Sequence, residues 1–372
     1  MMINTCSRQH VEICGDEIMD KMLLEDCCEI LDSMRIPITA SERIEGPYPY
    51  YGANGIQDYV ADYIFDDELV LLAEDGGNFG SKERPIAYRV SGKCWVNNHA
   101  HVLKPKEGLN ADYLCYSLMF YNTDGLVNGA TRQKLTQATM RKMLITKRSA
   151  NEQMEIVNKI KLVRSIADKR TDEIQQLDRL IKARFVEMFG DPVSNPFELP
   201  VKKLSELGSL DRGRSQHRPR NAPELLGGPY PLIQTGEVAS AGLYITEYHN
   251  TYSEIGLKQS KMWKAGTLCI TIAANIAQTA IMTFDACFPD SVVGFVPYNE
   301  VNALYMHYWF GFFQKILEEQ APQVAQKNIN LKILSNLNVI VPETRMIKQF
   351  EDFVSQVDKS KQAHEYSGKI AA

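Results

Sequence analysis

The sequence predicts an α+β protein with two tandem, mainly β domains, each followed by a long helix, and the two helices pairing as an antiparallel coiled coil. Three observations predict this fold: motifs that return half a chain later, short β-branched runs between turn residues, and heptad spacing after each half. The predicted boundaries are 1–148 for the first domain, 149–190 for a central spacer helix, 191–342 for the second domain and 343–372 for a shortened distal helix. Within the first domain, residues 1–20 form an extension that we leave unassigned.

The two halves carry the same motifs in the same order. The string GPYPY at 46–50 returns as GPYPL at 228–232, an offset of 182 residues. Gln133 and Lys134 return as Gln326 and Lys327, and the apolar positions around them are offset by 194. The second half therefore has about a dozen extra residues in its middle loops, where surface insertions are tolerated. This pattern indicates duplication of one large domain.

Each half contains short β runs and one helix. In the first half the β runs are 58–65, 69–72, 86–90, 94–96 and 101–103, and the helix is 111–121. In the second half they are 243–248, 267–272, 280–284 and 292–296, with a helix over 302–318. Gly, Pro, Asn and Asp separate the runs, which is typical of antiparallel sheets.

The helix after the first half has clear start and stop signals. Ser149 and Glu152 have the spacing of a capping box, and Gly190 and Pro192 follow the last apolar position. Apolar residues then keep heptad spacing, apart from Arg170, and the seam restarts near the C-terminus until Lys361 interrupts it. The predicted coiled-coil and partner contacts are Ile156, Ile160, Val163, Ile174, Leu177, Ile181, Phe350, Val354 and Val357.

These two helices are expected to pack against each other. Residues 150–189 would form a rod of about 60 Å that holds the two domains apart. The alternatives are helices that pack on their own domains or that form a homodimer.

Charge is unevenly distributed along the chain. The 41 Lys and Arg face 46 Asp and Glu, a formal net charge of -5, which argues against a simple basic nucleic-acid binder. However, 125–151 contains no acid and six basic residues, and 212–220 contains four arginines. Two basic segments in matching repeats favour DNA binding over the alternative of solvated loops.

Catalytic signatures are absent from the sequence. It has no phosphate-binding loop, no G-x-S-x-G, no H-E-x-x-H and no methyltransferase motif. His99 and His101 alternate on a predicted strand without an obvious third metal ligand, and packing is the favoured interpretation. Glu74, Asp75 and Lys82 leave open a metal-dependent nuclease. We predict no catalytic residue, no metal and no cofactor in this chain.

Compartment signals are few. The eight cysteines form no CxxC pair, which indicates buried thiols in a reducing compartment. No apolar stretch reaches the roughly 18 residues of a membrane span, and the N-terminus lacks a secretory signal. We expect a cytoplasmic protein that does not contact a membrane.

Taken in order, these strings resemble the specificity subunit of type I restriction–modification systems. The resemblance runs from about Leu24 to Lys361 and rests on GPYPYYGANGI at 46–56, LLAEDG at 71–76, NEQMEIV at 151–157, PLIQTGE at 231–237 and QKNIN at 326–330. It implies two target-recognition domains that each read half of a split DNA sequence. The coiled coil would set the gap between the half-sites and help to dock two methyltransferase subunits.

The resemblance also implies which activities belong to other subunits. The chain would direct adenine-N6 methylation and ATP-dependent restriction without catalysing either. Its partners would be double-stranded DNA, two modification (methyltransferase) subunits and restriction (translocase and nuclease) subunits, with S-adenosylmethionine, ATP and Mg held by those subunits. The short second helix departs from the family pattern and puts the docking of one methyltransferase in doubt.

Base reading requires polar side chains on loops, which gives the predicted DNA contacts. They are Tyr51, Asn54, Asn78, Lys82, Arg132 and Lys134 in the first domain, and Arg212, Arg214, Arg218, Gln234, Asn275, Gln278, Gln326 and Lys327 in the second. The alternative functions are a self-contained metal-dependent DNA nuclease or modification enzyme, and an interaction scaffold that does not contact DNA.

Overall fold

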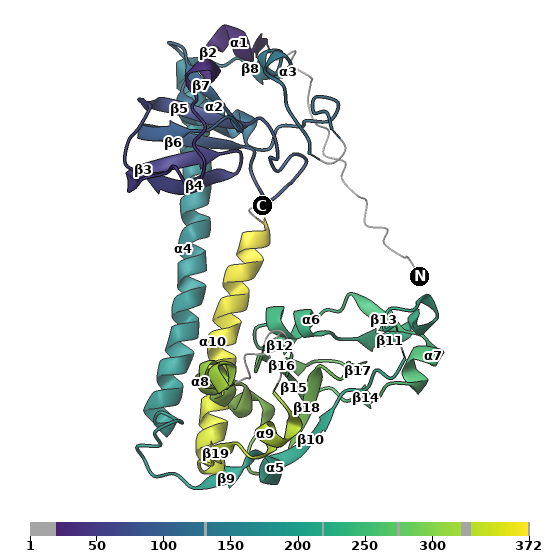
Figure 1. Cartoon of the computed structure of the whole chain (residues 1–372). Helices are drawn as coiled ribbons and strands as arrows, with labels where there is room; N and C mark the ends of the chain where they lie inside the picture. The colour runs from purple at the N-terminus through teal and green to yellow at the C-terminus, as the bar shows by residue number, and fades with distance from the viewer. Residues whose placement is uncertain (1–19, 130–131, 218, 274–275, 321–328, 371–372) are drawn as a thin grey trace, which may run out of the picture. The chain divides into compact units, whose positions relative to one another are not determined.

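The computed structural model describes residues 20–129, 132–217, 219–273, 276–320 and 329–370, and the backbone alone over 315–320 and 362–370 (Figure 1). The chain divides into two compact units, residues 1–166 and 167–372. The division falls inside the long helix α4 (Ala150–Phe189). No helix in the described part of the chain is both long and apolar enough to cross a membrane.

The first unit is built on one mixed sheet. Among its described residues, six strands lie in the order β2 (Cys28–Ile30), β7 (Ala100–Pro105), β5 (Phe65–Ala73), β6 (Ala87–Val96), β3 (Glu45–Gly52) and β4 (Gly55–Val60). Only the β3–β6 pair in this order is parallel. A second, two-stranded sheet pairs β1 (Lys21–Leu23) with β8 (Leu144–Thr146). The short helices are α1 (Leu24–Cys27), η1 (Asp32–Met34), α2 (Ala111–Leu118) and α3 (Gln137–Arg141).

The central strand β5 is buried on both faces. Because side chains alternate along a strand, Leu69 and Leu71 pack in one apolar cluster and Val70 and Leu72 in another. The second cluster also contains Leu114 and Leu118 of α2. The sequence predicted two β runs, 86–90 and 94–96, where the structure has the single strand β6. Its Gly92 adopts φ +78° and still pairs with Asp67 of β5, so the apparent turn is part of the ladder.

The second unit repeats this arrangement with more elaborate loops. Its described residues form a five-stranded sheet in the order β10 (Gly208–Arg212), β18 (Val292–Pro297), β15 (Leu268–Thr271), β16 (Thr279–Met282) and β12 (Tyr244–Ile245). A four-stranded sheet follows the order β13 (Asn250–Tyr252), β11 (Leu226–Leu232), β17 (Ala286–Cys287) and β14 (Met262–Trp263), and β9 (Val201–Lys203) pairs with β19 (Asn338–Ile340). The helices are α5 (Leu204–Leu207), η2 (Pro223–Leu225), α6 (Thr235–Ser240), α7 (Glu254–Lys258), α8 (Ala303–Gln320), α9 (Leu331–Ser335) and α10 (Thr344–Ile370).

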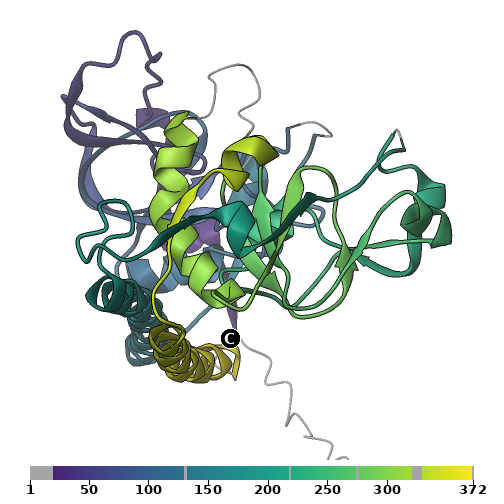
Figure 2. The ribbon, with the colours of Figure 1, turned by 90° about the horizontal axis from the view of Figure 1, so that it is seen from below.

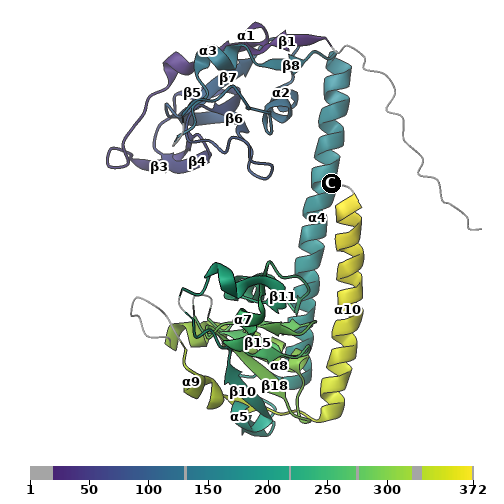
Figure 3. The same ribbon diagram turned by 90° about the vertical axis from the view of Figure 1, so that its right-hand side faces the viewer.

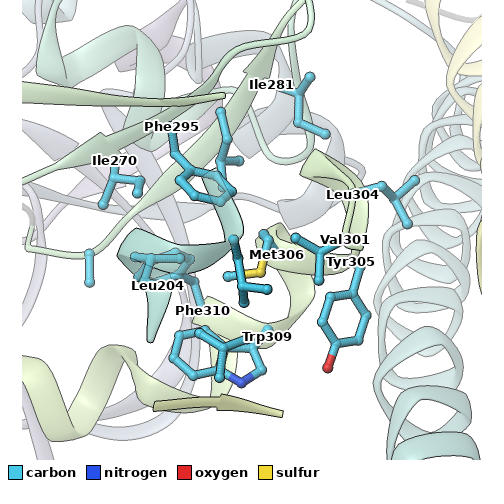
Figure 4. Packing of buried hydrophobic residues seen from close by; sticks show 14 of the residues in the cluster. Leu204, Ile270, Ile281, Phe295, Val301, Leu304, Tyr305, Met306, Trp309 and Phe310 are labelled. Carbon is cyan, nitrogen blue, oxygen red and sulfur yellow. The ribbon is translucent and has the colours of Figure 1, made fainter. Parts of the chain in front are cut away.

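The core of the second unit lies between the five-stranded sheet and α8. Figure 4 shows Ile270 and Phe295 of the sheet facing Met306 and Trp309 of α8, and all four belong to one buried cluster. The same cluster contains Phe185 of α4 and residues of α10. The second unit therefore folds together with the C-terminal half of α4.

Backbone pairing confirms the predicted duplication. The order β2-β7-β5-β6 of the first unit returns as β10-β18-β15-β16, and the β1–β8 pair returns as β9–β19. The amide N–H of Leu135 donates to the carbonyl of Glu74 at 2.7 Å, and the amide N–H of Ile329 donates to that of Ile272 at 3.0 Å. In each unit the segment after the predicted Gln-Lys motif is thus attached to the end of the central strand.

Helix α4 begins and ends where its sequence signals predict. The amide N–H of Ser149 donates to the Glu152 carboxylate at 2.8 Å, and the amide N–H of Glu152 donates to Ser149 Oγ at 3.4 Å. Gly190 ends the helix with φ +74°, a left-handed conformation that favours glycine.

Within the second unit, α10 runs antiparallel to α4 (Figures 1, 2 and 3). The Phe350 ring lies 5.6 Å from the Phe189 ring, and Lys361 Nζ lies 2.5 Å from Asp178 Oδ1. Residue numbers therefore rise along α10 as they fall along α4, which confirms the predicted antiparallel coiled coil. Its buried seam contains the predicted residues Ile181, Phe350, Val354 and Val357, while Ile174 and Leu177 are half-buried.

The seam is uncovered in the middle of α4. Residues 161–169 are all exposed, and Leu162, Val163 and Ile166 have 61%, 51% and 41% of their surface exposed. The predicted contact residues Ile156 and Ile160 are half-buried. Helix α10 has 27 residues against the 40 of α4.

Candidate nucleic-acid interface

In the first unit, predicted DNA-contact residues meet at the turn that follows β5. Asn54 Nδ2 donates to the Gly76 carbonyl at 3.0 Å, and Arg132 Nη2 lies 3.0 Å from Asp75 Oδ1. Lys134 Nζ lies 3.1 Å from Glu74 Oε1. The side chains of Arg132 and Lys134 remain 59% and 50% exposed, so both cations are available to a ligand at this edge.

Backbone hydrogen bonds fix the segment that carries these cations. The Gly76 amide donates to the Gln133 carbonyl at 3.1 Å, and Asn128 and Lys134 exchange two backbone hydrogen bonds of 3.0 and 2.7 Å. Gly129 adopts φ +104°, and a Cβ there would lie 2.4 Å from the Arg132 carbonyl oxygen, so this turn requires glycine. In the acid-free segment, residues 128–129 and 132–134 are therefore fixed by backbone hydrogen bonds beside the end of β5, and we call this surface the basic edge.

The other predicted contacts of the first unit are less concentrated. Lys82 is exposed on the loop before β6, and Asn78 is half-buried on the same loop. Tyr51 lies on β3 and packs beside the apolar cluster of Leu69 and Leu71, where burial raises the pKa of its hydroxyl. The structure therefore gives Tyr51 a packing role as well as a partly exposed ring.

In the second unit, Arg212 and Arg214 project from the end of β10. Both are exposed and flank the buried Gly213, whose amide donates to the Val292 carbonyl at 2.9 Å. A Cβ at Gly213 would lie 2.2 Å from the Phe288 carbonyl oxygen, so glycine allows the arginine loop to pack against the sheet edge. The hydrogen bond from Lys261 holds the pKa of the neighbouring Asp211 below its usual range, which leaves a carboxylate paired to lysine.

The rest of the arginine loop is held by side-chain contacts. Gln259 Oε1 accepts from the amides of Gln216 and His217 at 2.6 and 3.0 Å, and Arg220 Nη2 lies 2.6 Å from Asp290 Oδ1. The loop and the predicted residue Gln234 line one cavity of about 260 Å³. Its polar lining also includes Ser215, Asn221, Thr235 and Asn250. Arginines, amides and hydroxyls are the groups that contact phosphates and base edges.

Gln278 lies apart from the arginine loop. It lines a larger cavity of about 860 Å³ with residues of α4, α6, β12, α8 and α10, among them Lys182, Tyr244 and His307. Burial lowers the pKa of His307 to about 4, and its Nδ1 lies 3.0 Å from Thr279 Oγ1. The predicted residues Arg218, Asn275, Gln326 and Lys327 lie outside the described residues.

One group of metal-ligating side chains occurs among the described residues. Ligand atoms of Asp32, Glu74 and His101 all lie within 4.8 Å of one another. The Arg35 guanidinium contacts both carboxylates, at 2.6 Å to Glu74 and 3.7 Å to Asp32. A cation of the protein already neutralises these acids, so the group does not fit a metal ion.

The nuclease interpretation of the Glu74–Asp75 turn meets the same difficulty. Glu74 pairs with Arg35 and Lys134, and Asp75 pairs with Arg132 and His99. A catalytic metal needs carboxylate oxygens that are free to coordinate it. In this unit those oxygens serve instead to orient cations at the edge.

Sequence reasoning did not identify several residues that build these edges. Asp75 and His99 support Arg132, and Gln259 holds the arginine loop. The spacing of His99 and His101 indicates that both side chains lie on the same face of a strand, but it does not reveal which residues they contact. Asp32, 69 residues before His101, carried no sequence signal at all.

Comparisons with known proteins agree on one family. Residues 17–178 and 196–370 each match the family described as "Type I restriction modification DNA specificity domain". A Haemophilus influenzae protein described as a putative type I restriction enzyme specificity subunit is 28% identical over 352 residues, which cover 93% of this chain and 88% of that protein. The EcoprrI specificity subunit of Escherichia coli is 25% identical over 109 residues, 29% of this chain and 26% of that protein.

Solved structures share the fold over nearly the whole chain. The type I restriction–modification S subunit of M. genitalium matches with a TM-score of 0.56 and 12% identity, covering 96% of this chain and 95% of that one. A chain from a study of the assembly and conformational transition of the type I system matches with a TM-score of 0.58 and 15% identity, covering 95% and 94%.

Proposed function

The chain belongs to the type I restriction–modification DNA specificity family, and from this premise we propose that it reads a bipartite DNA target for partner subunits that carry out the chemistry. The two units share a topology, and each presents cations on an edge beside its central sheet. The presence of exposed cations beside the central sheet of each unit is the observation that carries the proposal, because one reader per half-site requires a DNA-binding surface on both units.

Each edge offers the two kinds of contact that DNA recognition needs. Exposed arginines and lysines neutralise phosphates and position the protein, and amides and hydroxyls beside them contact base edges in a groove. In the first unit these groups are Arg132, Lys134 and Asn54. In the second unit Arg220 and Gln234 line one cavity, and Arg212 and Arg214 are exposed on the same loop as Arg220.

The coiled coil is proposed to recruit the modification subunits. Leu162, Val163 and Ile166 form an exposed apolar stripe in the middle of α4, and such a contiguous stripe on a helix marks a protein-binding surface. Two modification subunits holding S-adenosylmethionine would methylate adenine N6, and restriction subunits holding ATP and Mg would cleave. The chain itself is proposed to be non-catalytic and to act in the cytoplasm.

The test compares the chain alone with the chain and its partners. The purified chain, incubated with DNA, Mg and S-adenosylmethionine, is expected to leave the DNA uncut and unmethylated. Addition of the modification subunits is expected to produce methylated adenines on opposite strands at a fixed spacing. Methyl transfer or cleavage by the isolated chain would favour the self-contained enzyme instead.

A further inference from the structure

A buried ionic network lies directly behind the basic edge of the first unit. His101 on β7 is fully buried, and its Nδ1 lies 2.7 Å from Asp32 Oδ2. Its Nε2 lies 2.9 Å from the backbone carbonyl of Leu135. Glu74 joins the network through Arg35 at 2.6 Å and through Lys134 at 3.1 Å.

Both ring nitrogens of His101 lie within hydrogen-bond distance of oxygen atoms. Burial favours the neutral form of Asp32, but hydrogen bonds from His101, the Val102 amide and Gln137 outweigh it and hold the pKa of this carboxyl below its usual range. Asp32 is therefore a carboxylate that only accepts. The Leu135 carbonyl also only accepts, so both ring nitrogens of His101 face acceptor oxygens.

The His101 ring contacts the segment that carries the edge cations. Leu135, which accepts from His101, directly follows Lys134, and its own amide donates to Glu74. Gln137 Nε2 donates to Asp32 Oδ2 at 2.9 Å. Residues 133–137 are thus held both by backbone hydrogen bonds to the turn after β5 and by contacts with His101 and Asp32 of the buried network.

The second unit has a corresponding pair of strands, but its described residues hold no corresponding charge network. Ile30 pairs with Leu103 in the first unit, and Leu210 pairs with Phe295 in the second. Two residues further along, β10 continues to Arg212, which pairs with Val293, whereas β2 has ended and Asp32 lies in η1 beside His101. Arg212 is exposed and Val293 is buried in the apolar core. Among the residues that the structure describes, the charge network is therefore found in the first unit alone.

We propose that His101, as the doubly protonated centre of the Asp32–Glu74–Arg35 network, is a positioning residue that sets the geometry of Arg132 and Lys134 for recognition of the first half-site alone. This inference rests on the proposed function. A buried cation with two fixed acceptors tolerates little displacement, because each broken bond leaves an uncompensated charge. The second half-site is read without such a device.

The substitution Asp32→Asn tests the proposal with little change of shape. The amide still accepts from Val102, but it removes the carboxylate that requires a second proton on His101. With the modification subunits present, methylation-sensitive sequencing should show about tenfold weaker discrimination at positions of the first half-site and unchanged discrimination in the second. The control Glu29→Gln, an exposed acid on neighbouring β2, should leave both halves unchanged.

Two further measurements keep the proposal open to contradiction. If Asp32→Asn does not fold, Gln137→Met offers a second test, because it removes one hydrogen bond to Asp32 without burying a charge. This variant should also weaken base discrimination at the first half-site. Nitrogen NMR of the histidine rings in the full chain should show both His101 nitrogens protonated at neutral pH. A neutral His101 ring, or an equal loss of base discrimination at both half-sites, would overturn the proposal. A wild-type chain that yields no paired methylation motif would instead overturn the proposed function.

Discussion

Lys361 of α10 forms an ion pair with Asp178 of α4, with Nζ 2.5 Å from Oδ1. Lys361 falls on the heptad position where the sequence predicts an interruption of the apolar seam, and its side chain is only 17% exposed. Asp358, one turn earlier on α10, lies 3.7 Å from the same ammonium. The ion pair therefore extends the antiparallel pairing past Val357, the last buried apolar residue of α10 among the side chains that the structure describes.

Removal of this ammonium should weaken the coiled coil. Lys361→Met keeps the length of the side chain but leaves Asp178 and the half-buried Asp358 without a cation between them. We expect a loss of about 1 kcal/mol in the free energy of unfolding, because Asp178 is largely exposed. Thermal unfolding of the full chain measures this, with Lys348→Met, an exposed lysine of the same helix, as the control. Equal effects of the two substitutions would contradict a structural role for the pair.

The stability of the second unit should fall in acid because of His307. Burial is the main cause that lowers its pKa to about 4, with the charges of Lys182 and Lys361 adding to it and the hydrogen bond at Thr279 and the charge of Asp178 opposing it. The unfolded chain binds a proton near pH 6.5, so the contribution of His307 is complete above that pH and is lost as pH falls towards 4. The loss should be roughly 3 kcal/mol.

A matched variant isolates this contribution. His307→Gln keeps a hydrogen-bonding group for Thr279 but cannot titrate, so its stability should depend less on pH between 7 and 4. His249→Gln, an exposed histidine of the same unit, serves as the control. Denaturant unfolding at several pH values gives the difference, and parallel curves for wild type and His307→Gln would refute the assignment.

Reversal of the charge at Arg212 and Arg214 should reduce DNA affinity in a salt-dependent way. Arg212→Glu with Arg214→Glu removes two cations beside the edge of the second unit. If each contacts a phosphate, the slope of log K against log salt should fall by about two. The double reversal Lys348→Glu and Lys359→Glu on α10 changes the net charge equally. Binding titrations at several salt concentrations should show a larger effect for the arginines, and identical slopes for both variants would count against this surface.

The apolar stripe of α4 should bind a modification subunit. Leu162→Glu with Val163→Glu places charges at positions where the native side chains are already 61% and 51% exposed. The free energy of unfolding should therefore change by less than about 0.5 kcal/mol. Association with the modification subunit should be lost, as measured by size-exclusion chromatography of the mixture. Ser165→Glu, exposed on the same turns of α4, should leave the complex intact. A complex that forms normally with the double variant would place the docking surface elsewhere.

The long-range pattern of the chain could be predicted from its sequence because it depends on periodicity. Heptad spacing predicted the pairing of Phe350 and Val354 with α4, and the repeated motifs predicted that Leu135 and Ile329 occupy equivalent places. Local signals were misleading where pairing overrides them, as at Gly92, which looked like a turn and lies inside β6.

The candidate interface was predictable in its cations but not in their supports. Arg132 and Lys134 stand out as basic residues without nearby acids in the sequence, yet Asp75 and Glu74, some 57 to 60 residues earlier, pair with them in space. The burial of His101 against Asp32 depends on the register between β2 and β7. This register cannot be predicted from the residue pattern of either strand alone.

Methylation-sensitive sequencing of DNA from cells that express this chain with its modification subunits tests the central claim most directly. The account predicts one split motif, with methylated adenines on opposite strands in two half-sites separated by a gap of fixed length and variable sequence. Methylation at a single continuous motif, or none with all subunits expressed and assembled, would contradict the reading of DNA by two equivalent units.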